Sequence, residues 1–253
     1  MSDVIKWQIM SESKFSAVDA TLGYAYQVRC ALVHSLVHAR NGEDFEVGIE
    51  TLDDVTFTAT GGEPLELLQT KHHLGSKSAL TDAAVDLWKT LRIWIEGRES
   101  GAIPPTAKLY LITTATASSA SAAAKLRGHS DERDPSAAID ALNATALTSG
   151  NEKNKLAYLA YSRLSLADRR SLLNQVYVID VAPNISNLDE VLRQQVRWLA
   201  PIKHEDAFLQ RLEGWWFRRV LKQLTKAAPL IESREIDLHM ETCASNSSGK
   251  PCP

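Results

Sequence analysis

The chain has 253 residues, a formal net charge of −3 and an apolar fraction of 44%, which is typical of a globular protein and not of a disordered one. This slightly acidic balance excludes a protein that attracts nucleic acid through its overall charge, so any DNA contact has to come from a local basic surface. Cys30, Cys243 and Cys252 have neither the number nor the spacing of a disulfide framework or a zinc site. No stretch resembles a signal peptide or a membrane span, so we expect a cytoplasmic protein without membrane contact.

The first predicted element is a helix from Ala17 to about Ala39, after a polar lead-in over residues 1–16. Apolar residues recur there every three to four positions, as on the buried face of a helix. Asn41-Gly42 gives a stop signal. His34 and His38 have the spacing of metal ligands on a helix, but serine follows His34, so the zincin motif is absent.

Three short strands are predicted next. The first covers Phe45 to Glu50, the second Val55 to Thr60, and the third Leu65 to Lys71. Gly61-Gly62 separates the second strand from the third. Two adjacent glycines adopt positive φ angles at no steric cost, so this pattern predicts a β-hairpin.

The hairpin brings polar side chains to one edge. Asp54 stands at the start of one strand, and Gln69 and Lys71 stand at the end of its partner, two positions apart and therefore on one face. Glu50 closes the preceding strand near the same edge. Oxygen ligands of this kind suit Mg²⁺ or Mn²⁺, and a lysine beside such a metal can orient a water molecule. The pattern indicates metal-assisted phosphodiester hydrolysis.

Two adjacent aspartates leave the choice of metal ligand open. Successive strand residues face opposite ways, so we expect at most one of Asp53 and Asp54 on the face that carries Gln69. We favour Asp54, because it starts the hairpin strand.

These residues resemble the PD-(D/E)xK nuclease superfamily, in its Q-x-K branch that includes Mrr-type restriction endonucleases. The resemblance rests on Gly23-Tyr24-Ala25-Tyr26-Gln27, on Glu50-x-x-Asp53-Asp54-Val55 and on Gln69-x-Lys71-His72. The pattern is similar to the N-terminal DNA endonuclease domain of Cap-type effectors in CBASS anti-phage systems. It covers roughly residues 20–115, and it departs from the superfamily in having glutamine where an acid is usual before the lysine motif.

The resemblance implies a restriction-endonuclease-like α/β fold, with a mixed sheet flanked by helices. It also implies a Mg²⁺-dependent endodeoxyribonuclease that acts in anti-phage defence on double-stranded DNA, as a homo-oligomer or with a sensor or regulatory defence protein. The expected site comprises Glu50, Asp53, Asp54 and Gln69 around the metal, Lys71 beside the water, and Gln27 and His72 as auxiliary groups.

The loop after the hairpin carries Ser76 and Lys77, which we expect to contact DNA phosphates. Thr81-Asp82 is typical of a helix start, with threonine as the N-cap. A strand from Lys108 to Thr114 is apolar on both faces, which favours a central position. Strand, crossover helix and strand together predict an α/β sheet.

Further helices and one strand are predicted in the second half. Ser165 and Asp168 have the spacing of a capping box, and Val176 to Val181 reads as a fifth strand. Asn187 is expected to cap another helix. The helix from His204 to Lys226 is locally basic, and Arg218 and Arg219 are its candidate DNA contacts.

These elements suggest a nuclease domain over residues 17–182, a helical extension packed on it over residues 183–240, and a disordered tail over residues 241–253. The alternative is a non-catalytic, nuclease-like interaction module in a multicomponent defence complex. The lack of clustered His and Cys disfavours a zinc hydrolase, and the lack of a glycine-rich phosphate loop disfavours an ATPase.

Overall fold

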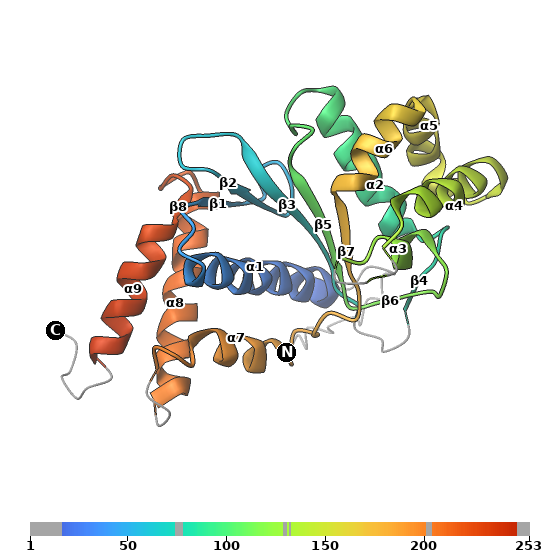
Figure 1. Ribbon diagram of the computed structural model, residues 1–253. Helices are drawn as coiled ribbons and strands as arrows, with labels where there is room; N and C mark the ends of the chain where they lie inside the picture. The colour runs from blue at the N-terminus through green and yellow to red at the C-terminus, as the bar shows by residue number, and fades with distance from the viewer. Residues whose placement is uncertain (1–16, 74–77, 129–130, 132, 201–203, 247–253) are drawn as a thin grey trace, which may run out of the picture.

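The computed structural model describes residues 17–73, 78–128, 131, 133–200 and 204–246. Its centre is a six-stranded sheet with the strand order β7-β5-β3-β2-β1-β8 (Figure 1). The strands are β1 (Glu46–Ile49), β2 (Val55–Thr58), β3 (Pro64–Lys71), β5 (Lys108–Thr113), β7 (Val176–Ile179) and β8 (Ile231–Glu232). β3, β5 and β7 run parallel, whereas the pairs β2–β3, β1–β2 and β1–β8 are antiparallel. The predicted mixed sheet flanked by helices is therefore confirmed.

The predicted hairpin is formed by β2 and β3. Gly61 has a φ of 66°, a conformation that glycine adopts without steric cost. Val55 lies opposite Leu68, so the start of β2 meets the end of β3. This register brings residues 53–54 beside residues 69–71, where the start of β2 lies next to the end of β3.

The crossover from β3 to β5 contains α2 (Val85–Glu99). Threonine at position 81 does not cap this helix, because the N-cap is Ala84 and makes no side-chain capping bond. Asp82 instead accepts the backbone N–H of Ala122 and, through its carbonyl, the indole N–H of Trp88. The expected N-cap was wrong because residues 81–84 form a turn, closed by the N–H of Ala84 to the carbonyl of Thr81 at 3.0 Å, and the helix begins only at Val85.

Helices cover both faces of the sheet (Figure 1). One face carries α2, α3 (Ala122–Lys125), α4 (Pro135–Thr148), the short 3₁₀ helix η1 (Glu152–Asn154), α5 (Lys155–Arg163) and α6 (Leu166–Gln175). The other carries α1 (Ala17–Arg40), α7 (Leu188–Val196), α8 (Glu205–Leu224) and α9 (Ser233–Asn246). Leu67 of β3 packs into the first layer and Leu68 into the second, as strand alternation requires.

Several local predictions can be compared with the structure. Ser165 and Asp168 form the predicted capping box of α6. Asn187 occupies the N-cap position of α7 but makes no side-chain capping bond. A separate two-stranded sheet joins β4 (Ala79–Leu80) to β6 (Thr116–Ala117). Within the described ranges, no helix is both long and apolar enough to cross a membrane.

The C-terminal part is more integrated than the sequence indicated. β8 pairs with β1, so the segment expected as a helical extension also contributes a strand to the sheet. The predicted disordered tail was wrong for residues 241–246, which belong to α9. Residues 247–253, like the lead-in 1–16, lie outside the described part of the chain.

Arg219 of α8 holds α9 and the segment before β8 in place through hydrogen bonds. Its Nε and Nη2 donate to the two carboxylate oxygens of Glu235, each at 2.7 Å, and its guanidinium also donates to the carbonyls of Pro229 and Leu230. Arg219 is 8% exposed, whereas Arg218 is exposed. The expectation that Arg219 contacts DNA was therefore wrong, because its donors are used inside the fold.

We expect Arg219→Ala to lower the free energy of unfolding by roughly 2–3 kcal/mol, less than the loss of one partner from a fully buried pair because Glu235 is partly exposed. The neighbouring Arg218→Ala is the matched control and should change stability by less than about 0.5 kcal/mol. Urea denaturation followed by circular dichroism measures both values. Equal effects of the two substitutions would contradict this role of Arg219.

His38 of α1 sits between two carboxylates. Its Nδ1 lies 2.6 Å from Glu43 and its Nε2 lies 3.2 Å from Glu66, which also pairs with Lys108. Burial lowers the pKa of His38, but the hydrogen bonds to Glu66 and Glu43 outweigh this and raise the pKa above its usual value. The same contacts lower the pKa of both glutamates.

A raised histidine pKa stabilises the fold most at low pH. The contribution is complete below the unfolded-state pKa of about 6.5 and is lost as the pH rises through the folded-state value. We expect His38→Gln to lower the free energy of unfolding more at pH 6 than at pH 9. The two losses should differ by roughly 0.5–1 kcal/mol, a small figure because Glu43 is half exposed. Urea denaturation at both pH values tests this, with His204→Gln as an exposed control. A pH-independent difference would refute it.

Candidate active site

Polar side chains from four elements meet at one edge of the sheet. Glu50 follows β1, Asp53 and Asp54 precede β2, and Gln69 and Lys71 end β3. Gln27 reaches the same edge from α1, where its Nε2 donates to the Glu50 carboxylate at 2.9 Å and to the Asp54 carbonyl at 2.6 Å. The sequence motif thus becomes a single hydrogen-bonded cluster.

Gln69 is the centre of this cluster. Its Nε2 donates to Oδ1 of Asp53 and to Oδ1 of Asp54, the latter at 2.9 Å. Its Oε1 accepts a hydrogen bond from Lys71 Nζ at 2.7 Å. The amide is therefore oriented with its N–H groups toward the carboxylates and its oxygen toward the lysine.

Asp54 is fixed by a second set of donors. Its Oδ2 accepts the backbone N–H of Thr70 at 2.8 Å and the Thr70 hydroxyl at 3.0 Å. Its Oδ1 accepts one bond, from Gln69, and a carboxylate oxygen can accept two. Asp54 is half-buried and Glu50 is exposed, so both carboxylates are placed where a solvated cation can reach them.

Asp53 lies differently from the other predicted ligands. It is 7% exposed, and Trp94 of α2 donates its indole N–H to Oδ2 at 2.6 Å. Its Oδ1 also accepts the backbone N–H of Asp54 at 2.9 Å. Burial raises the pKa of Asp53 to about 7, although the bonds from Trp94, Gln69 and Asp54 each lower it. Both oxygens are turned into the protein, which argues against Asp53 as a metal ligand.

The expectation that only one aspartate shares a side with Gln69 was wrong. β2 begins at Val55, so Asp53 and Asp54 both precede the strand. Strand alternation does not govern them, and Gln69 contacts both.

The donor set fits a hard divalent cation. Glu50 and Asp54 supply carboxylate oxygens and Gln69 supplies an amide oxygen, which are ligands suited to Mg²⁺ or Mn²⁺ together with water. Among the described residues, no three His, Cys, Asp or Glu side chains are grouped as metal ligands. A cation held here therefore has to rely on two carboxylates, one amide and water, which favours Mg²⁺ over zinc.

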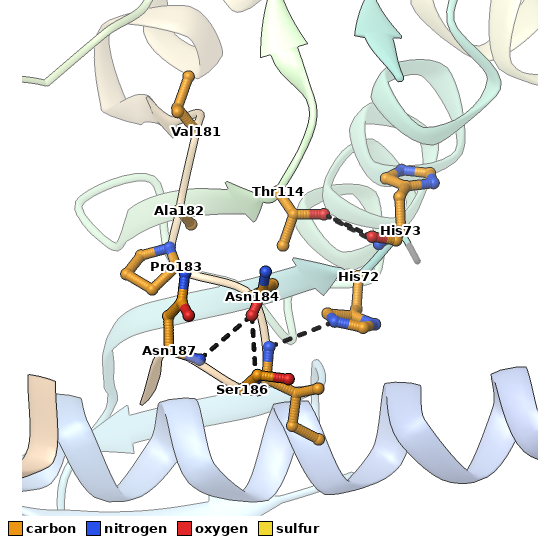
Figure 2. A pocket seen from close by; sticks show the side chains of 10 residues that line it. His72, His73, Thr114, Val181, Ala182, Pro183, Asn184, Ser186 and Asn187 are labelled. Atoms are coloured by element: carbon orange, nitrogen blue, oxygen red, sulfur yellow. Dashed lines mark hydrogen bonds between the residues drawn. The ribbon is translucent and has the colours of Figure 1, made fainter. Parts of the chain in front are cut away.

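A pocket of about 340 Å³ lies beyond the ends of the parallel strands, lined by His72, His73, Thr114 and residues 181–187 (Figure 2). The ring of His72 packs against that of Tyr26, with 4.8 Å between the ring centroids. Its Nε2 accepts the backbone N–H of Ile185 at 3.4 Å. Burial and the neighbouring His73 lower the pKa of His72. His72 thus lines this pocket, and its Nε2 bonds to Ile185 and not to the Gln69 cluster.

The predicted DNA contacts are dispersed. Ser76 and Lys77 lie outside the described residues. Arg218 is exposed on α8, on the sheet face that α1 also covers, and Arg219 is buried against Glu235. No local sequence signal indicates the bond from Trp94 to Asp53, because the two residues lie 41 positions apart.

No protein-family model matches the sequence, and a search of curated proteins finds no match. Among solved structures, the fold is similar to the Cap4 SAVED/CARF-domain containing receptor of Moraxella osloensis, with a TM-score of 0.52 and 14% identity over 92% of this chain and 50% of that one. It is also similar to the Cap4 receptor of Acinetobacter baumannii with the cyclic trinucleotide 3′3′3′-cAAA, with a TM-score of 0.51 and 12% identity over 89% of this chain and 46% of that one. At these identities the likeness shows the fold alone, and the chain spans about half the length of these receptors.

We expect Trp94→Phe to lower the free energy of unfolding by about 1–3 kcal/mol beyond any packing change, because it removes a donor from a buried carboxylate. Trp198→Phe is the matched control, since Trp198 is 57% exposed. Urea denaturation followed by circular dichroism compares the two. A loss no larger than that of the control would show that the indole bond contributes little.

Proposed function

We propose that the protein is a metal-dependent DNA endonuclease that acts in anti-phage defence. The observation that carries the proposal is the convergence of Glu50, Asp54, Gln69 and Lys71 in one cluster at a sheet edge. Two carboxylates, an amide oxygen and an amine within hydrogen-bonding reach are the groups that metal-assisted phosphodiester hydrolysis needs. The likeness in fold to the Cap4 receptors supports the link to defence.

In this proposal Glu50, Asp54 and the Gln69 oxygen hold Mg²⁺. The bound ion supplies Lewis acidity at the scissile phosphate and charge neutralisation at the leaving 3′ oxygen. Lys71 orients the attacking water and stabilises the negative charge that develops on the phosphate. Gln27 holds Glu50 and the loop before β2 in place through its two hydrogen bonds.

Regulation is proposed to come from outside the described residues. Duplex cleavage needs two active sites, so we expect a homo-oligomer on double-stranded DNA. The chain spans about half of each similar receptor, so a sensor or regulatory defence protein is a fitting activator.

A second candidate is the binding of a cyclic oligonucleotide. It is favoured by the A. baumannii structure, which contains a cyclic trinucleotide. The 340 Å³ pocket is large enough for part of such a ligand. Among the described residues that line it there is no lysine or arginine to pair with phosphates, so the endonuclease remains our preferred proposal.

The test is cleavage of plasmid and linear duplex DNA with Mg²⁺, Mn²⁺ or EDTA, each with and without 3′3′3′-cAAA. Lys71→Ala should lower the metal-dependent rate by at least about 100-fold, because it removes the charge that stabilises the transition state. Lys89→Ala is the matched control, since Lys89 is exposed on α2, and it should cleave like wild type.

Equal cleavage by wild type and Lys71→Ala would refute the assignment of the site. No cleavage by wild type under any condition would favour the non-catalytic interaction module. Calorimetric titration with 3′3′3′-cAAA addresses the second candidate independently, because it needs no catalytic activity.

A further inference from the structure

The orientation of the Gln69 amide depends on its contact with Asp53, on the buried side of the site. Gln69 donates to Asp53, and Asp53 in turn accepts the indole N–H of Trp94. Trp94 is fully buried in the core between α2 and the sheet. A continuous line of hydrogen bonds therefore runs from the core through Asp53 and Gln69 to Lys71.

The charges along this line explain the residue type at position 69. Both oxygens of Asp53 accept N–H groups, from Trp94, from the Asp54 backbone and from Gln69, so the residue at position 69 has to be a donor. A glutamate at position 69 would place a third carboxylate against those of Asp53 and Asp54 in a buried setting, where like charges repel strongly. Glutamine donates to both aspartates and still presents one oxygen to Lys71.

We propose that Asp53 is a positioning residue: it fixes the Gln69 amide with its oxygen toward Lys71, and it does so without binding the metal. The inference deepens the proposed function and rests on it for the metal and cleavage measurements. The contact itself is independent of catalysis. Three contacts set the orientation of the amide, to Asp53, Asp54 and Lys71, and loss of Asp53 removes the one that comes from the buried side.

Asp53→Leu is the first variant. Leucine is close to aspartate in shape but accepts no hydrogen bond, so Gln69, the Asp54 backbone N–H and Trp94 all lose their acceptor on residue 53. We expect Mn²⁺ affinity, measured by calorimetry on the folded variant, to fall about 10–100-fold, as for other groups that orient a metal ligand. The Gln69 side-chain amide resonances should shift in ¹⁵N NMR spectra.

Trp94→Phe is the matched control for a merely structural role. It removes the hydrogen bond to Oδ2 of Asp53 but leaves Oδ1 facing Gln69. We expect it to lower stability while Mn²⁺ affinity and the single-turnover cleavage rate stay near wild type. Equal losses of Mn²⁺ affinity in Asp53→Leu and Trp94→Phe would overturn the proposal.

A stability cycle tests the contact without any activity. Asp53→Asn should destabilise wild type, but it should stabilise the Gln69→Glu variant, because it removes a repulsion and can donate to the new carboxylate. Such a change of sign supports the proposal, and a destabilising effect in both backgrounds overturns it. If wild type cleaves no DNA, the endonuclease proposal fails, whereas the NMR spectra and this cycle still decide the role of Asp53.

Discussion

The bond from one glutamine amide to two aspartates is the interaction on which the rest of this site depends. Gln69 joins the loop before β2 to the end of β3, and its oxygen holds Lys71. Without this neutral donor, the carboxylates of Asp53 and Asp54 would face each other in a partly buried setting with no N–H group between them. The amide therefore lets acidic groups gather where the proposed chemistry needs them.

Much of the fold was predictable because its signals are local. The hairpin followed from Gly61-Gly62 and the flanking apolar runs, and the capping box followed from the spacing of Ser165 and Asp168. The convergence of residues 50, 54, 69 and 71 also followed, because a hairpin register fixes which strand ends are neighbours.

What the sequence could not reveal depends on tertiary contacts. Asp53 was treated as a strand residue, but it lies just before β2 and is held by Trp94 from another element. Arg219 was grouped with the basic face of its helix, although Glu235 on the next helix binds its guanidinium. Thr81 had the chemistry of an N-cap, but Ala84 occupies that position. For Asp53 and Arg219 a distant partner overrides the local preference, and for Thr81 a turn delays the start of the helix.

The pairing of β8 with β1 has a consequence for how the chain is made. Phe45 and Ser233, which flank this pairing, are joined by hydrogen bonds although they lie 188 positions apart in the sequence. During synthesis from the N-terminus, β1 emerges early, and its outer edge stays unpaired until β8 follows. Unpaired strand edges promote association between chains, and long-range pairings form slowly. The strand that leads to Glu50 therefore completes its hydrogen bonding only after the residues up to β8 have been translated, and the pairing with β8 then covers the exposed strand edge.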